Sequence, residues 1–380
     1  MSSWPKKYKL LIDFLDKFDP KRRFKFRGSA ISNFMKVKSE FENSFILEEF
    51  QDEVSEAERW IKELNKLKNT VTKSYNIDGI IFSREFGSFL EGLIPHFKRK
   101  MFLKLHDLMR GKLTLDDFES WARKALTTCF RTNMRTLYQS WGFLAILKHL
   151  ADYSGRIVYP EYGYLPLERF GMQRVGRIPP NCVVKIASKN SHSKLLSFFI
   201  EAPRPLGWGS SEDLQKVWGL YTAMRPDLMV YNSSVMDIIE PSHNPPIKRP
   251  NFIVEFKELD GWFFRRREIL PPETSPLTAE EWRSRWIKGL YDGLAEAIGL
   301  KVKGKRKISS REKRKFLRFF DYEIVASYCK VYKPDKMFLI SRVKVLDDIK
   351  RKLEDDGVIV LDNVEFNIDK LKPVVEEFLR

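Results

Sequence analysis

Apolar side chains recur at three- and four-residue intervals through the first 150 residues, a spacing that gathers them on one face of an α-helix. The pattern runs from Leu47 to Thr72 and again from Phe86 to Met109, where Pro95 should kink or divide the helix. Thr114 is the expected N-cap of a further helix, because a Pro-free segment from Phe118 to Ala151 follows it. The first part of the chain is therefore predicted to be a bundle of about five helices.

The pattern changes near residues 152–155, beyond which prolines punctuate short apolar runs of the β type. Strands are expected at residues 183–187, 195–200, 228–231, 252–256, 322–326, 337–340 and 358–361, and helices at residues 212–224, 278–300, 344–353 and 368–379. Strands that alternate with helices predict an α/β (α+β) fold, in which helices flank a central mixed β-sheet. We therefore expect a helical domain at residues 1–152 and an α/β domain at residues 153–380.

Positive charge is concentrated in two parts of the chain. Lys and Arg exceed Asp and Glu by 68 − 51 = 17; residues 1–150 contain 28 basic and 19 acidic side chains, and residues 301–318 contain 10 basic side chains and one acidic. Such clustering favours a polyanionic partner. A solvated basic surface without a partner is the alternative. The four Gln and the 31% of charged residues are also typical of a protein from a thermophile.

The sequence also indicates in which cellular compartment the protein is expected and which type of metal site it could contain. No apolar run approaches the roughly 18 residues of a membrane-spanning helix, and the first residues lack the pattern of a signal peptide. We therefore expect a cytoplasmic protein with no membrane partner. The three Cys and five His are scattered, with no spacing typical of a zinc site. Any metal is accordingly expected on oxygen ligands.

Two short apolar runs carry the candidate chemistry. Asp227 follows Pro226 at the start of the run at residues 228–231, and Glu255 and Lys257 belong to the stretch from Asn251 to Glu258 that contains the expected strand at 252–256. Side chains alternate along a strand, so Glu255 and Lys257 share one face, about 6.6 Å apart along the chain. If the two strands pair, Asp227 and Glu255 can share a divalent cation. Mg²⁺ suits such a site, since it binds few carboxylates and retains several waters.

The pair Pro226-Asp227 and the triplet Glu255-Phe256-Lys257 resemble the motif of the PD-(D/E)xK nuclease superfamily, which has the restriction-endonuclease-like fold. The resemblance implies that Asp227 and Glu255 bind Mg²⁺, that the carbonyl of Phe256 completes the protein ligands, and that Lys257 orients or activates the attacking water. It implies that Mn²⁺ can replace Mg²⁺. The expected function is a metal-dependent DNA endonuclease, an endodeoxyribonuclease that hydrolyses phosphodiester bonds.

Further site residues follow less directly from the same resemblance. Many members carry an additional acid on a helix before the first strand, and Glu201 or Glu212 could serve here. Some members have a Gln-x-x-x-Tyr pattern on the helix after the lysine strand, from which this chain departs. Lys288 on that expected helix could instead approach a phosphate.

Basic side chains elsewhere are candidates for nucleic-acid contact. Arg265 and Arg266 directly follow three aromatic residues and could combine charge with base stacking. Lys21–Arg23, Lys25 and Lys98–Lys100 could hold a duplex backbone. The densest basic segment could give affinity that depends on salt and not on base sequence, and its candidate residues are Lys303, Lys305, Arg306, Lys307, Arg311, Lys313 and Arg314.

Other functions remain open at this point. The chain could be a non-catalytic nucleic-acid-binding protein that retains a nuclease-like fold, a nuclease subunit that is active only with a helicase or transposase partner, or a partner-binding protein with an accidental triad. DNA is the expected partner, but RNA stays open because no motif reads a 2′-hydroxyl. A double-strand cut would need two sites, which a homodimer would supply.

Overall fold

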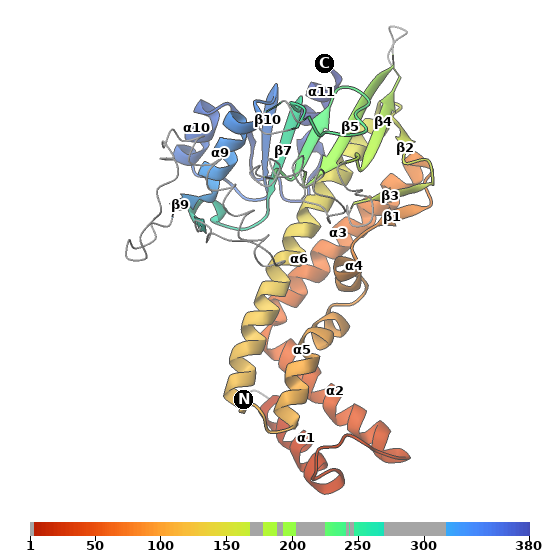
Figure 1. Cartoon of the computed structure of the whole chain (residues 1–380), viewed down its shortest axis with the longest axis vertical. Helices are drawn as coiled ribbons and strands as arrows, with labels where there is room; N and C mark the ends of the chain where they lie inside the picture. Colours follow the sequence, from red (N-terminus) through yellow and green to blue (C-terminus); the bar gives the residue numbers. More distant parts are fainter. Residues whose placement is uncertain are drawn as a thin grey trace. The chain divides into compact units, whose positions relative to one another are not determined.

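The computed structural model describes residues 4–167, 178–187, 193–202, 225–240, 243, 247–269 and 317–380 (Figure 1). The chain forms two compact units: unit 1 holds residues 1–65 and 84–137, and unit 2 holds residues 66–83 and 138–380. Helices α3 (Gln51–Tyr75) and α6 (Leu115–Asp152) each begin in unit 1 and end in unit 2. The composition changes at residue 152 because α6 ends there, whereas the division between the units lies inside that helix.

The helical character expected of the first part of the chain is confirmed. Residues 4–152, which are all described, contain six helices: α3, α6, α1 (Trp4–Phe18), α2 (Ser29–Glu49), α4 (Arg84–Glu91) and α5 (Leu93–Met109). The predicted division near Pro95 is also present, since Gly92 separates α4 from α5 and Pro95 lies in the first turn of α5, where a missing N–H costs no helical hydrogen bond. The backbone N–H of Asp117 donates to Thr114 Oγ1 at 3.1 Å, as expected of an N-cap.

A mixed seven-stranded sheet forms the centre of unit 2, with the order β11-β10-β7-β6-β5-β4-β2. Strands β7, β10 and β11 are parallel, and the remaining neighbours from β7 to β2 are antiparallel. The bounds are β2 (Arg156–Tyr159), β4 (Cys182–Ile186), β5 (Lys194–Ile200), β6 (Leu228–Tyr231), β7 (Phe252–Lys257), β10 (Lys336–Ser341) and β11 (Val358–Leu361). Two small sheets pair β1 (Gly79–Ile81) with β3 (Tyr164–Pro166) and β8 (Arg266–Ile269) with β9 (Leu317–Phe320).

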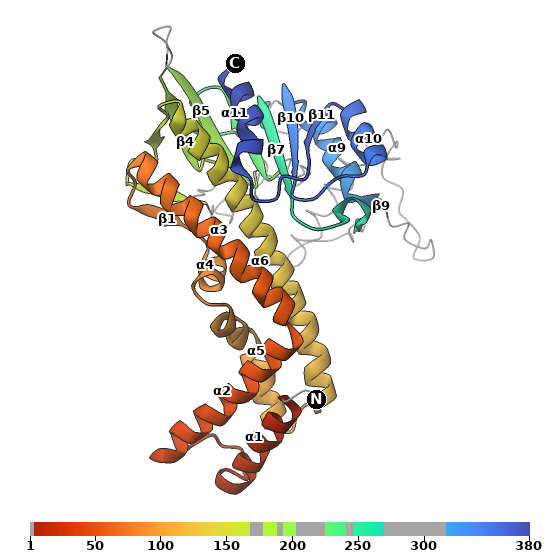
Figure 2. The ribbon, with the colours of Figure 1, turned by 180° about the vertical axis from the view of Figure 1, so that it is seen from behind.

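Helices cover both faces of the large sheet, and they include α9 (Asp321–Tyr332), α10 (Asp347–Asp355) and α11 (Lys372–Leu379). On one face, the Phe378 ring of α11 contacts the Phe252 ring at 4.7 Å, and Figure 2 shows α11 in front of the strands. The C-terminal part of α6 reaches the same face at Gly142. On the other face, Ile253 of β7 belongs to a buried core that α9 and α10 complete. The chain thus has the predicted α/β character with a mixed sheet.

Two predictions of local structure need correction. Residues 322–326 are not a strand, because they lie in α9. The carboxylate of Glu323 accepts the Phe320 N–H at 2.8 Å, and acidic side chains in a first turn stabilise the positive end of a helix. The expected helix at 368–379 is a 3₁₀ turn (Ile368–Leu371) followed by α11, with Pro373 at the helix start. The helices expected at 212–224 and 278–300 lie outside the described residues.

None of the helices in the described part of the chain combines the length and the apolar composition needed to cross a membrane.

Candidate active site

Asp227 stands directly before β6 and connects that strand to β7. Its Oδ2 accepts the backbone N–H of Phe256 at 2.8 Å, and its own N–H donates to Glu255 Oε2 at 3.1 Å. The register pairs Leu228 with Val254, so one further step along both strands sets Asp227 opposite Glu255. The structure therefore brings together the two acidic residues that the sequence singled out, although 28 residues separate them.

Glu255 and Lys257 form a buried ion pair on one face of β7. Lys257 Nζ lies 2.8 Å from Glu255 Oε1, and the two residues are 8% and 3% exposed. The ammonium also lies 5.6 Å from the ring centre of Trp262, within the range of a cation–π contact. Trp262 is held in turn, because its Nε1 donates to Ser341 Oγ of β10 at 3.1 Å. Charges in the middle of a strand are costly unless they have partners, and here each has one.

The backbone carbonyl of Phe256 points toward the same place. In a strand, the N–H and C=O of one residue point to the same side, and the N–H of Phe256 points to Asp227. The extended β6–β7 register sets Phe256 opposite Pro226. Proline has no N–H, so it cannot donate the ladder hydrogen bond that this carbonyl would otherwise accept. Because of the sequence Pro-Asp, the Phe256 carbonyl therefore receives no ladder hydrogen bond from residue 226 on the Asp227 side.

Helix α6 reaches this site from the opposite face of the sheet. Gln139 Nε2 donates to Asp227 Oδ1 at 2.6 Å. One turn later, a Cβ added to Gly142 would lie 2.6 Å from Phe256 Cδ1, so only glycine allows this close approach. The Tyr138 ring lies edge-on to Phe256 at 6.5 Å, and burial raises the pKa of Tyr138 well above its usual range, so its hydroxyl stays protonated. Helix α6 thus positions both Asp227 and the central residue of the triplet.

Sequence reasoning missed Gln139. The residue lies 88 positions before Asp227, and no motif connects the two. The only signal in the sequence is its place among large apolar residues of a long helix that precedes the sheet strands.

Of the two candidates for an additional acid, the described structure contains Glu201. The β5–β6 register pairs Ile200 with Leu228, and the N–H of Glu201 donates to the carbonyl of Asp227 at 2.9 Å. Glu201 therefore lies directly across the ladder from Asp227, and its φ of 47° ends the regular strand at this point. Glu212 lies outside the described residues.

The candidate nucleic-acid contacts can be located only in part. Arg265 and Arg266 are exposed and follow the 3₁₀ turn that holds Trp262. The Arg266 guanidinium lies 5.1 Å from the ring centre of Phe320, so charge and an aromatic face do occur together here. Lys21–Arg23, Lys25 and Lys98–Lys100 are described and belong to unit 1. The other candidates lie outside the described residues, namely Lys288, Lys303, Lys305, Arg306, Lys307, Arg311, Lys313 and Arg314.

The candidate metal ligands near Asp227 are oxygen atoms, which belong to two carboxylates and one backbone carbonyl. Hard cations such as Mg²⁺ and Mn²⁺ prefer this donor set. The amide of Gln139 and the ammonium of Lys257 hold the two carboxylates in place. The residues present therefore fit a divalent metal site, with a fixed cation beside it.

Comparison with known proteins gives no match: no protein-family model, no curated protein and no solved structure matches the chain.

Proposed function

We propose that the chain is a Mg²⁺-dependent endodeoxyribonuclease whose catalytic domain, at residues 153–380, has a restriction-endonuclease-like fold. One observation carries the proposal: Asp227 and Glu255, from adjacent strands, are joined by a direct hydrogen bond, and Lys257 lies on the same face as Glu255. A mixed sheet covered by helices on both faces supports the fold assignment.

In this proposal Asp227, Glu255 and the Phe256 carbonyl hold the Mg²⁺. The ion supplies Lewis acidity and lowers the pKa of a bound water. Lys257 orients the water and counters the negative charge that develops on the phosphate. Glu255 and Trp262 hold the ammonium of Lys257 in place. Gln139 keeps the carboxylate of Asp227 oriented, and Glu201 is the candidate for an additional acid. Mn²⁺ is expected to replace Mg²⁺ at such oxygen ligands.

A basic hollow in unit 1 supports a nucleic-acid partner. It has a volume of about 640 Å³, and its lining residues are Pro20, Lys21, Arg22, Arg23, Lys25, Arg110 and Lys112. Arg22 fastens the loop to the end of α5, because its Nε donates to the Met109 carbonyl at 3.1 Å. Both carboxylate oxygens of Asp19 accept backbone N–H groups of the same loop. Two of the six cations have acidic neighbours, since Arg22 pairs with Asp16 and Lys112 Nζ lies 3.8 Å from Asp107 Oδ1. The hollow still carries excess positive charge, which a phosphodiester backbone would neutralise.

A second function is favoured by the pairing of Lys257 with Glu255. A close ion pair at 2.8 Å would also suit a scaffold that binds nucleic acid without cutting it, or a nuclease subunit that needs a helicase or transposase partner to become active. RNA as the nucleic acid and a homodimer as the assembly belong to the same set of proposals.

Asp227→Asn and Asp335→Asn provide a matched test, because both residues follow a proline shortly before a strand. Among the described residues, the carboxylate of Asp335 contacts Arg249 and Asn251, each at 2.7 Å, at the surface of the protein. We expect Asp227→Asn to lower Mg²⁺- or Mn²⁺-dependent cleavage of supercoiled and linear DNA by about 100-fold or more. Asp335→Asn should cleave like the wild type.

Binding of a labelled duplex should be similar in both variants. Equal cleavage by the two variants would remove Asp227 from the active site. Duplex binding without any cleavage by the wild type would favour the scaffold or the partner-dependent subunit.

A further inference from the structure

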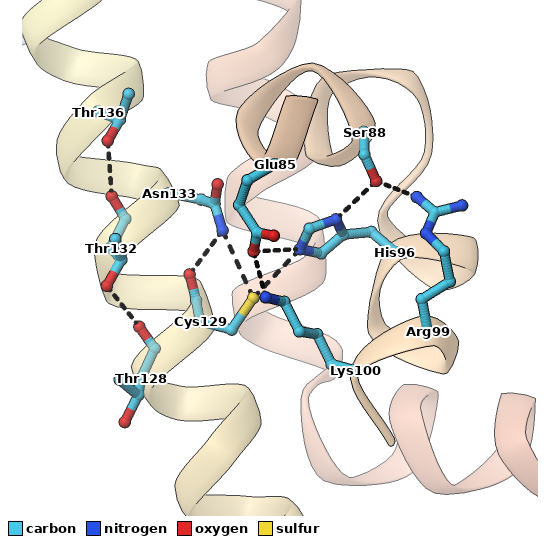
Figure 3. Close-up of polar contacts among 10 residues, drawn as sticks. All are labelled: Glu85, Ser88, His96, Arg99, Lys100, Thr128, Cys129, Thr132, Asn133 and Thr136. Atoms are coloured by element: carbon cyan, nitrogen blue, oxygen red, sulfur yellow. Dashed lines mark hydrogen bonds and ion pairs between the residues drawn. The ribbon is translucent and has the colours of Figure 1, made fainter. Parts of the chain in front are cut away.

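A second group of ligand-type side chains lies in unit 1, whereas Asp227, Glu255 and Lys257 belong to unit 2. Glu85 of α4, His96 of α5 and Cys129 of α6 point toward one another in Figure 3. One carboxylate oxygen, one ring nitrogen and the sulfur all lie within 4.8 Å of one another. His96 Nε2 is 3.2 Å from Cys129 Sγ and 3.5 Å from Glu85 Oε1. The ring of His96 is nearly fully buried, at 2% exposed, and Cys129 is 9% exposed.

These separations are close to those of ligands around one zinc ion. With Zn–S near 2.3 Å, Zn–N and Zn–O near 2.0–2.1 Å and tetrahedral angles, sulfur and nitrogen lie about 3.6 Å apart, and nitrogen and oxygen about 3.3 Å. The observed distances of 3.2 and 3.5 Å differ from these by about 0.4 and 0.2 Å. Small side-chain movements would therefore make room for the ion.

The residues around the three side chains also fit a zinc site. His96 Nδ1 lies 2.8 Å from Ser88 Oγ, and Nε2 faces Cys129 and Glu85. In the tautomer that carries its proton on Nδ1, Ser88 accepts that proton and the lone pair of Nε2 can bind a metal. Asn133 Nδ2 donates to the Cys129 carbonyl at 2.8 Å and lies 3.4 Å from its sulfur, where it can stabilise a thiolate. Such outer hydrogen bonds orient metal ligands and tune their basicity.

Two cations near the cluster oppose metal binding and have to be weighed. Lys100 forms an ion pair with Glu85, and Arg99 contacts Ser88 (Figure 3). The side chains of Lys100 and Glu85 are 39% and 52% exposed, so their pair contributes little and Lys100 can turn into solvent. A thiolate and a carboxylate together balance the two charges of Zn²⁺, which leaves a neutral centre beside these cations.

We propose that Glu85, His96 and Cys129 form a Zn²⁺ site that joins α4, α5 and α6 and has a fourth position for water. Sulfur with imidazole selects zinc over Mg²⁺ and Ca²⁺, and three protein ligands leave one position open. No spacing in the sequence indicates this site, since 11 and 33 residues separate His96 from Glu85 and Cys129. It contrasts with the expectation that any metal would sit on oxygen ligands alone.

Cobalt spectroscopy tests the site directly, because a thiolate ligand gives a charge-transfer band that an oxygen-only site lacks. One equivalent of Co²⁺ added to the metal-free full-length chain should produce this band, and Zn²⁺ should remove it. Cys129→Ser should abolish the band, and Cys329→Ser, a change at another cysteine with little exposure, should keep it. The centre at Asp227 and Glu255 cannot produce the signal, so this test is independent of the nuclease proposal.

A second variant covers the case in which Cys129→Ser fails to fold. Glu85→Gln changes a side chain that is half exposed, and we expect it to lower Zn²⁺ affinity by about tenfold or more while the helical circular dichroism stays unchanged. Zn²⁺ should also raise the melting temperature of the wild type. Absence of both the cobalt band and the zinc-dependent shift in the wild type would overturn the proposal, as would unchanged affinity in Glu85→Gln. The cluster would then be a buried His–Cys hydrogen bond.

Discussion

Replacement of Gly142 by alanine tests whether the contact between α6 and β7 positions the proposed active site. A Cβ at Gly142 would lie 2.6 Å from Phe256 Cδ1 and closer still to Cε1, whereas ordinary contact begins at 3.4 Å. The closest ring atom, Cε1, would lie at 2.1 Å, so this edge of the ring would have to move by at least 3.4 − 2.1 = 1.3 Å. Phe256 is only 2% exposed, so close-packed neighbours oppose that movement.

Two effects of the substitution oppose each other. Alanine in a helix interior is favoured over glycine by about 1 kcal/mol, and overpacking a core costs about 1–3 kcal/mol. We expect the overpacking to win, with a net loss of up to about 2 kcal/mol in the free energy of unfolding. Because the N–H of Phe256 donates to Asp227, cleavage should fall as well.

The assay is urea unfolding followed by tryptophan fluorescence, with Gly87→Ala as the matched control. Gly87 lies inside α4, and a Cβ there would meet nothing within 4 Å, so this change should stabilise by about 1 kcal/mol. Phe256→Leu removes the ring and should rescue Gly142→Ala, with a coupling energy of about 0.5–3 kcal/mol. If Gly142→Ala were as stabilising as Gly87→Ala, residue 142 of α6 would not be in close contact with the Phe256 ring of β7.

Two further predictions concern DNA binding and the buried ion pair. Combining Arg23→Ala with Lys112→Ala in the basic hollow should weaken duplex binding and reduce the slope of log Kd against log salt by about 2, whereas Lys62→Ala, an exposed change elsewhere in unit 1, should not. An unchanged slope would mean that the basic hollow is a solvated surface that does not contact the duplex. Lys257→Met leaves the buried Glu255 without its cation and should cost about 3–5 kcal/mol of unfolding free energy in EDTA, but less in Mg²⁺ because the ion replaces the lost charge. Equal losses in both buffers would argue against a metal at Glu255.

Much of the secondary structure could be predicted, because its signals are local. The runs at 228–231 and 358–361 match β6 and β11 from end to end, since alternating or continuous apolar residues between polar turns define short strands. Residues 322–326 misled the prediction, because Tyr322, Ile324 and Val325 have strand propensity and the deciding contact is the side chain of Glu323 on the N–H of Phe320.

The candidate site was predictable in its charged residues but not in its supports. Asp227, Glu255 and Lys257 stand out in the sequence because charges inside apolar strands are costly without a reason. Gln139 does not stand out, because a polar residue on a helix is ordinary. Its role depends on where α6 crosses the sheet, which Gly142 allows.

The sequence by itself determined six of the seven strands of the large sheet, the helical first part and the acidic and basic residues worth testing, because each depends on neighbours a few positions away. Tertiary structure alone decided which distant residues meet. It brought Gln139 to Asp227, divided the units inside α6, and gathered Glu85, His96 and Cys129 from three helices. The physical reason is that helix packing depends on side-chain shape along whole faces, so no short sequence pattern records the contacts that result.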